Sequence, residues 1–267
     1  MRTTSLCLPF LLCIVPAALY AEGATPDFAD LFTEAGVEGT LVVYELETDT
    51  TLVHDAERAA TRFIPASTFK IPNSFIGLET GVVESPSTIW PWDGTERNLS
   101  AWNRDHSLHT AYRNSVVWFY QELARGVGSE RMATWLERLD YGNASIDGGI
   151  DRFWLDGELR ISAHEQIDFL VRLHRDELPF SAKTLALGKE VMVEERTGDH
   201  VLRAKTGWAL RTPKQLGWYV GYVERPVRAE GGPRTTFFAL NIDLEDSAQA
   251  AERKRIVRAA LARLGVL

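Results

Sequence analysis

A serine and a lysine stand three residues apart in the sequence Ser67-Thr68-Phe69-Lys70. We predict a helix from Ser67 to Glu79, on which residues three apart share a face, so the amine lies beside the hydroxyl. A serine hydroxyl needs a neighbouring base to act as a nucleophile, and a helix start adds N–H groups that can hold an oxyanion. A serine that only caps the helix, followed by a lysine on the surface, would give the same sequence pattern. Pro72 lies late for the first turn of the predicted helix, where a proline distorts the helix.

A second lysine begins the sequence Lys205-Thr206-Gly207, at the end of a strand-like run from residue 201 to 205. Lys205 offers a positive charge to a substrate carboxylate, Thr206 adds a hydroxyl donor, and Gly207 allows a ligand to approach the backbone. The alternative interpretation of this triplet is a solvent-exposed strand end without a function. The chain has only six lysines, so chance predicts ~0.04 occurrences of this triplet, which favours a functional interpretation.

A third short motif, Ser115-Val116-Val117, lies between the other two in the sequence. We place Ser115 at the start of a helix that runs to Gly126. The Ser115 hydroxyl can relay a proton between a lysine and a leaving group, although a simple helix N-cap explains an isolated serine at this position equally well.

The elements that must position these motifs read as strands, then helices, then strands and a final helix. Alternating or apolar runs predict the strands 39–46, 50–54, 201–205, 217–223 and 235–243. A short helix at 27–35 and an amphipathic helix at 249–264 end the chain, and Ser162 with Glu165 forms a capping box for a central helix. We therefore predict an α/β (α+β) fold, with a sheet lobe at about 22–66 and 196–267 and a helical lobe at about 67–195. The sheet is antiparallel, the terminal helices flank it, and the site lies between the lobes.

The first 21 residues are typical of a secretory signal peptide, with a basic residue at Arg2, an apolar run from 6 to 15 and a small residue at Ala21. Both cysteines, Cys7 and Cys13, lie inside it, so residues 22–267 form a single exported catalytic domain without disulfides or thiol chemistry.

Composition excludes several classes of protein. The 267 residues are 45% hydrophobic and 25% charged, with a net charge of −8, which excludes disordered, fibrous and polytopic membrane chains. We expect no nucleic-acid partner for an acidic chain without a basic run. We also expect no metal, because the His106-x-x-His109 pair is the one close pair among six histidines.

The three motifs, in this order, resemble those of the serine β-lactamase and penicillin-binding superfamily. Tyr141-Gly142-Asn143, Trp154-Leu155-Asp156-Gly157 and the Phe69 inside the first motif are similar to class D, the oxacillinase type. Class A enzymes have Ser-Asp-Asn where this chain has Ser115-Val116-Val117. The resemblance extends from Thr40 to the last helix and implies the serine β-lactamase fold.

The resemblance also implies the roles of residues. In class D enzymes, the lysine corresponding to Lys70 carries carbon dioxide as a carbamate (N6-carboxylysine), and there is no diffusible cofactor. An apolar pocket keeps such an amine neutral; Trp154 would donate its indole N–H to the carbamate. Carbamylated Lys70 would act as the general base, taking the proton of Ser67 and later activating water. Ser67 would attack the β-lactam carbonyl, the backbone N–H groups of Ser67 and Trp208 would hold the oxyanion, and Ser115 with Lys205 would pass a proton to the ring nitrogen. The substrate would be bound by residues of the second motif, a C-terminal arginine and the cleft walls: Thr206, Gly207, Trp208, Arg253 (or the adjacent Arg255), Trp102, Val117 and Leu155.

Two other interpretations stay open on the sequence. A penicillin-recognising sensor or a transpeptidase shares the serine and lysine motifs but does not turn over a β-lactam quickly. A secreted binding domain without enzymatic activity would show no covalent adduct at Ser67. For the hydrolase we expect a periplasmic location, a small-molecule β-lactam partner and no membrane association after signal cleavage; the sequence does not determine the oligomeric state or the range of antibiotics.

Overall fold

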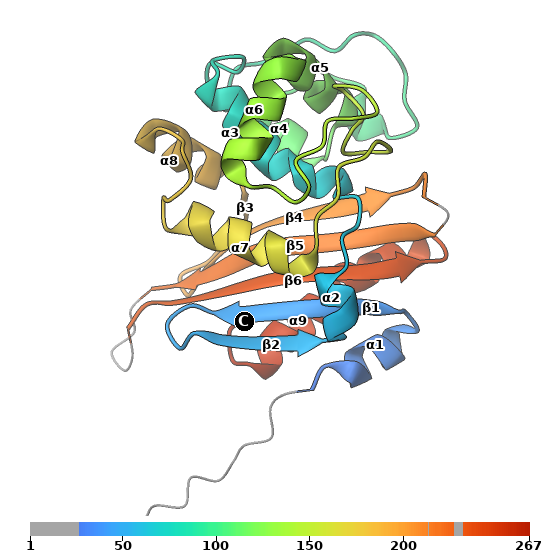
Figure 1. Ribbon diagram of the computed structural model, residues 1–267, viewed down its shortest axis with the longest axis vertical. Helices are drawn as coiled ribbons and strands as arrows, with labels where there is room; N and C mark the ends of the chain where they lie inside the picture. Colours follow the sequence, from blue (N-terminus) through green and yellow to red (C-terminus); the bar gives the residue numbers. More distant parts are fainter. Residues whose placement is uncertain (1–26, 213, 227–231) are drawn as a thin grey trace, which may run out of the picture.

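A six-stranded antiparallel sheet forms the centre of the protein, as predicted (Figure 1). The computed structural model describes residues 27–212, 214–226 and 232–267, so the predicted signal peptide at 1–21 lies outside the described residues. The strands follow the order β2-β1-β6-β5-β4-β3 across the sheet, and every neighbouring pair is antiparallel. Their bounds are β1 Gly39–Glu45, β2 Thr50–His54, β3 Val193–Arg196, β4 Val201–Ala209, β5 Gln215–Arg225 and β6 Arg234–Leu244.

The central strands are buried on both faces, because helices cover each side of the sheet. Nearly every residue of β5 and β6 is buried, which accounts for their continuous apolar runs of Val, Tyr, Phe and Ile. On one face, the terminal helices α1 (Ala29–Ala35) and α9 (Glu252–Arg263) pack against the sheet through a core that includes Phe32, Leu240 and Ile256. The prediction that the terminal helices flank the sheet is confirmed.

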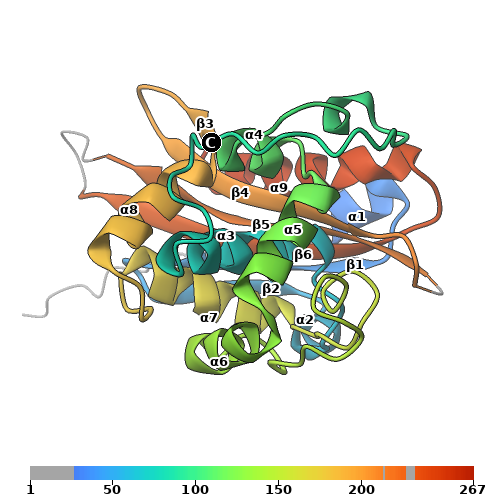
Figure 2. The same ribbon diagram turned by 90° about the horizontal axis from the view of Figure 1, so that it is seen from above.

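The other face of the sheet carries the helical lobe (Figure 2). This lobe packs around a second, larger hydrophobic core. Phe75, Phe119 and Leu170 are fully buried in it and come from three different helices. The elements of this lobe and its connections are α2 Ala56–Ala60, η1 Ala66–Phe69, α3 Lys70–Glu79, η2 Ser100–Trp102, α4 Leu108–Arg113, α5 Val117–Val127, α6 Ser129–Leu139, α7 Ala163–His174 and α8 Ala182–Val191; the 3-10 turn η3 Ala248–Ala251 precedes α9.

The capping box at the start of α7 is present as predicted, with Ser162 and Glu165 each accepting a hydrogen bond from the other's backbone N–H. The predicted helical range to residue 195 was wrong at its end, because β3 begins at Val193 and pairs with β4. Four residues at the edge of a sheet give too short a pattern to be separated from the preceding helix α8.

Two predicted helix starts were also wrong. Ser67 does not cap a helix; it lies in the 3-10 turn η1, and α3 begins at Lys70, which puts Pro72 inside the first turn, where a proline is tolerated. Ser115 is not an N-cap either, because its φ of 53° is left-handed and α5 begins at Val117. Both serines therefore sit in tight turns between elements. In the described part of the chain, no helix is long and apolar enough to span a bilayer.

Candidate active site

The side chains of Ser67 and Lys70 meet at the junction of η1 and α3. The Nζ of Lys70 lies 2.8 Å from the Oγ of Ser67. Lys70 is fully buried, whereas Ser67 is half-buried and so remains open to a substrate. The preceding Ala66 has a φ of 48°, a left-handed conformation that costs energy for a residue with a Cβ. The chain thus holds a strained turn immediately before the predicted nucleophile.

Burial favours the neutral amine form of Lys70 over its ammonium form. Desolvation, followed by the positive charge of Lys205, holds the pKa of Lys70 well below the usual value of a lysine. Its ammonium position also lies 5.2 Å from the centre of the Tyr120 ring, in an apolar setting. A neutral amine can accept a proton from Ser67 and can also react with carbon dioxide.

The turn η1 packs directly on β4, and Gly207 makes this approach possible. A Cβ at Gly207 would lie 2.9 Å from the Pro65 carbonyl oxygen and 3.1 Å from the Thr68 methyl group. The space that a Cβ would occupy at Gly207 is filled by η1, so this glycine serves the packing of η1 on β4; that it also lets a ligand approach the backbone stays a prediction. The indole of Trp218 in β5 fixes the same segment by donating to the Ile64 carbonyl at 2.9 Å.

Lys205 is the second buried lysine of the site, with 4% of its surface exposed. Burial, helped by the positive charges of Arg253 and Lys254, lowers the pKa of Lys205 to about 7. Its Nζ donates to the Thr206 carbonyl at 3.0 Å and lies 5.5 Å from the centre of the Tyr112 ring. A lysine with a pKa near 7 is suited to moving a proton at neutral pH.

The backbone of Trp208 lies in the part of β4 whose edge is not paired with β3. The N–H of Ala204 donates to the Met192 carbonyl, on the side where β3 lies. Because backbone groups alternate along a strand, the N–H of Trp208 points to the same side, beyond the end of β3. An N–H at this position can act as the oxyanion donor that the resemblance implies, and the Trp208 indole donates to the Gln215 side chain at 3.0 Å.

Arg253 and Arg255 were alternative candidates for binding the substrate carboxylate, and the structure places them in different surroundings. Arg253 donates to the Gly207 carbonyl at 2.5 Å and stands 5.7 Å from the centre of the Trp208 ring. Arg255 instead pairs with Glu252 and reaches the Leu31 carbonyl of α1. Only Arg253 of this pair therefore lies at the Lys205-Thr206-Gly207 motif.

Comparison with known proteins agrees with this geometry. Residues 39–262 match the family model described as the penicillin binding protein transpeptidase domain. The chain is 42% identical to β-lactamase OXA-48 of Klebsiella pneumoniae over 230 residues, which cover 86% of this chain and 84% of the relative. A crystal structure of the class D β-lactamase YbXI from Nostoc has a TM-score of 0.86 and 44% identity, and the match covers 90% of this chain and 99% of that one. The FUS-1 (OXA-85) structure from Fusobacterium nucleatum subsp. polymorphum gives 0.85 and 38%, with 90% and 98% coverage.

This chain belongs to the class D β-lactamases. The family accounts for the fold class, with its antiparallel sheet and helical lobe.

In this class D chain, Trp154 has a buried polar atom that nothing satisfies. The side chain is fully buried, its ring centre lies 5.4 Å from that of Phe69, and its Nε1 has no hydrogen-bond partner among the described residues. A buried N–H without an acceptor costs about 1–3 kcal/mol. A carboxylate-like group on Lys70 is the kind of acceptor that such a donor fits, so the residues present suit a carbamate.

Ser115 and Trp102 lie close together at the turn between α4 and α5. Ser115 is half-buried in the turn between α4 and α5, and its N–H donates to the Tyr112 carbonyl. The indole of Trp102 donates to the Asn114 carbonyl at 2.9 Å, one residue before Ser115. Val117, two residues after Ser115, is half-buried at the start of α5.

The segment that carries Trp154 is held by contacts the sequence alone did not reveal. Asn143 accepts the Arg160 N–H at 2.8 Å and donates to the Glu158 carbonyl at 2.8 Å. Asp156 accepts from Arg211 at 2.6 Å, which ties this segment to the loop after β4. Leu155 stays half-buried between these anchors. The partners of Asn143 and Asp156 are distant in the sequence, so no local sequence pattern could have predicted these contacts.

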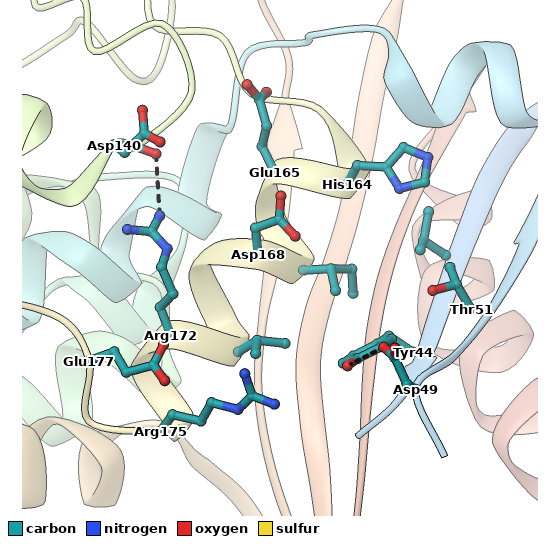
Figure 3. Close-up of a pocket in the computed structure, with 13 residues that line it drawn as sticks. Tyr44, Asp49, Thr51, Asp140, His164, Glu165, Asp168, Arg172, Arg175 and Glu177 are labelled. Atoms are coloured by element: carbon teal, nitrogen blue, oxygen red, sulfur yellow. Dashed lines mark hydrogen bonds between the residues drawn. The ribbon is translucent and has the colours of Figure 1, made fainter. Parts of the chain in front are cut away.

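A cavity of about 530 Å³ lies away from the Ser67–Lys70 pair, between α7 and the β1–β2 hairpin (Figure 3). It is lined by charged residues that include Asp168, Arg172 and Arg175, and by none of the predicted site residues. We assign no catalytic role to it. In the described part of the chain, no three His, Cys, Asp or Glu side chains are placed to hold a metal ion.

Proposed function

We propose that this protein hydrolyses the amide bond of penicillin-type β-lactams through an acyl-enzyme on Ser67, and thereby confers antibiotic resistance. The observation that carries the proposal is the 2.8 Å contact between Ser67 Oγ and a fully buried Lys70 Nζ. A serine beside a base held neutral by burial is an activated nucleophile.

Acylation follows from this contact. Lys70 removes the proton of the Ser67 hydroxyl as the oxygen bonds to the β-lactam carbonyl carbon. The N–H groups of Ser67 and Trp208 stabilise the negative oxygen. The bond from that carbon to the ring nitrogen then breaks, and Lys205, through the Ser115 hydroxyl, supplies the proton that the nitrogen needs.

Binding and deacylation use the groups around this core. Thr206 and Arg253 hold the substrate carboxylate, while Trp102 and Leu155 border the cleft. The proton that Lys70 took from Ser67 passes on to Lys205, which restores both lysines. Lys70 then takes a proton from water as the water oxygen bonds to the acyl carbon. The bond from that carbon to the Ser67 Oγ breaks, and Lys70 returns the proton to Ser67. Val117 and Leu155 keep the base in apolar surroundings.

We further propose that Lys70 is modified by carbon dioxide to N6-carboxylysine. When bound, carbon dioxide supplies an oxygen base in place of the amine. Two features of the chain support the modification: the lowered pKa of Lys70 leaves its amine free to react, and the unsatisfied indole N–H of Trp154 is buried beside Phe69.

The signal-like first 21 residues support export to the periplasm, where β-lactams are encountered. We propose that the exported chain acts there on small molecules, without a nucleic acid or membrane partner.

Substitution of the nucleophile tests the proposed activity. Ser67→Ala is expected to lower nitrocefin hydrolysis at least 1,000-fold and to abolish the acyl adduct in intact-mass spectra, because the bond-forming oxygen is absent. The exposed serine variant Ser87→Ala serves as the matched control and keeps both. Turnover by Ser67→Ala would contradict the proposal, and a stable adduct on the wild-type protein without release would instead indicate a sensor or transpeptidase.

A further inference from the structure

A cavity of about 340 Å³ adjoins Lys205, on the side away from Trp208. Lys205 and Thr206 line one side of it, and α4, the start of β3 and Lys254 of α9 line the others. The cavity is therefore continuous with groups that already belong to the site, but the catalytic steps above do not use it.

The walls of this cavity are cationic and its floor is apolar. Lys254 and Arg113 approach it from α9 and α4 respectively. Arg113 is exposed, and in the described part of the chain its guanidinium has no hydrogen-bond or ion-pair partner. The single acidic side chain in the lining, Glu194, is already engaged by Lys254 at 2.8 Å and by the Tyr219 hydroxyl at 3.1 Å. Buried apolar surface from Tyr112 and Met192 forms the floor.

The strand β4 gives the direction in which a substrate would reach this cavity. The outward-facing backbone positions along its edge are Trp208, Thr206 and Ala204, each two residues, or about 6.7 Å, from the next. In the proposed mechanism, Trp208 holds the reacting carbonyl of the substrate and Thr206 holds its carboxylate. The third position is Ala204, whose carbonyl accepts from the Tyr112 hydroxyl at 3.1 Å and which lines the cavity.

The chemistry of bicyclic β-lactams fits this order. In a cephem ring, the carboxylate-bearing carbon is bonded to a carbon that carries a variable substituent, on the side opposite the acylamino arm. A substrate whose carbonyl lies at Trp208 and whose carboxylate lies at Thr206 therefore directs this substituent toward Ala204.

We propose that the cavity between α4, β3 and Lys254 is a specificity subsite for an anionic substituent on the ring carbon next to the carboxylate-bearing carbon. Arg113 and Lys254 bind the anion, and the Tyr112 and Met192 surface accommodates the linking carbons. This inference rests on the proposed function, and it assigns a specificity-determining role to Arg113, which lies outside all of the sequence motifs.

The test compares two cephems that share the acylamino arm and differ only in this substituent, a propionate in one and its propionamide in the other. The ratio of their kcat/KM values, anionic over neutral, is measured for the wild type and each variant, so that any loss common to both substrates cancels. We expect a ratio above one for the wild type, a fall of about fivefold for Arg113→Gln, and a reversed preference for Arg113→Glu. Arg104→Gln, an exposed arginine outside the cavity, is the control and keeps the wild-type ratio.

The two proposals fail in different ways. If the wild type hydrolyses both cephems but the ratio stays the same in Arg113→Gln and Arg113→Glu, the subsite is overturned and the hydrolase remains. If the wild type hydrolyses neither cephem nor nitrocefin, the proposed function itself is wrong. Lys254→Met provides a second variant on the opposite wall, and its ratio should fall in the same direction.

Discussion

Ser67 and Lys70 are three residues apart and 2.8 Å apart in space, yet they belong to two different helical elements. Ser67 lies in a 3-10 turn, and Lys70 is the first residue of the α-helix that follows. The change of helix type leaves Ser67 half-exposed while Lys70 is fully buried. One short segment thereby places an accessible hydroxyl beside a desolvated amine, the two groups to which the proposed mechanism gives the roles of nucleophile and base.

Removal of the Trp154 indole N–H should raise the demand for carbon dioxide. Trp154→Phe keeps a large aromatic ring but deletes the unpartnered buried donor, so the carbamate proposed on Lys70 would lose a hydrogen bond. We expect the bicarbonate concentration that gives half-maximal nitrocefin hydrolysis to rise at least tenfold.

Trp218→Phe is the matched control, because its indole N–H already donates to the Ile64 carbonyl. That variant can lose stability, but its bicarbonate requirement should match the wild type. Equal requirements in Trp154→Phe and the wild type would rule out a carbamate contact at Trp154.

Lys205 should make stability rise with pH above neutrality. Its pKa is about 7 in the folded protein and near 10.5 in an unfolded chain, so between these values the unfolded state binds one more proton. The free energy of unfolding then increases with pH, by at most about 1.4 kcal/mol per pH unit from this group. Urea unfolding at pH 7, 8 and 9 should show a shallower rise in Lys205→Met than in the wild type. Lys183→Met changes an exposed lysine and should keep the wild-type slope; equal slopes in all three proteins would refute the prediction.

Gly207 should tolerate no side chain. In Gly207→Ala the new Cβ meets the Pro65 carbonyl oxygen at 2.9 Å and the Trp218 Cβ at 3.1 Å, so β4 must move away from η1. Overpacking of this kind costs about 1–3 kcal/mol, and the shift displaces Ser67 from Lys205. We expect kcat/KM for nitrocefin to fall at least tenfold. At Gly198 an added Cβ meets nothing within 4 Å, so Gly198→Ala should show neither effect; wild-type kinetics in Gly207→Ala would show that the close packing is dispensable.

The two neighbouring arginines of α9 should differ in their effect on substrate binding. Arg253→Met removes the guanidinium beside Gly207 and Trp208, and KM for a penicillin should rise roughly 10- to 100-fold, the effect of losing a charge-assisted contact. Arg255→Met breaks contacts with Glu252 and α1 only, and should leave KM near the wild-type value. A larger increase in KM for Arg255→Met than for Arg253→Met would reverse the assignment.

The sequence predicts five of the six strands, all except β3, because their signals are local. The apolar runs of β5 and β6 and the capping box at Ser162 each lie within a few residues. The positions of Ser67 and Ser115 were predicted less well, because a 3-10 turn and a left-handed residue arise from tertiary packing that overrides local preference.

Long-range contacts are the part of the site that the sequence could not supply. The use of Gly207 as a packing position depends on Pro65 and Thr68, more than 130 residues away. The choice between Arg253 and Arg255 depends on which side of α9 faces β4, and residues that neighbour each other on a helix point in different directions.

The most direct test of Lys70 as the base is the time course of the intact mass of Lys70→Ala after it is mixed with a penicillin. Acylation should be slow, and the acyl-enzyme on Ser67 should then persist with a release rate at least 1,000-fold below the wild-type rate. If the adduct of Lys70→Ala instead forms and disappears at the wild-type rate, Lys70 is not the base and the proposed mechanism is wrong.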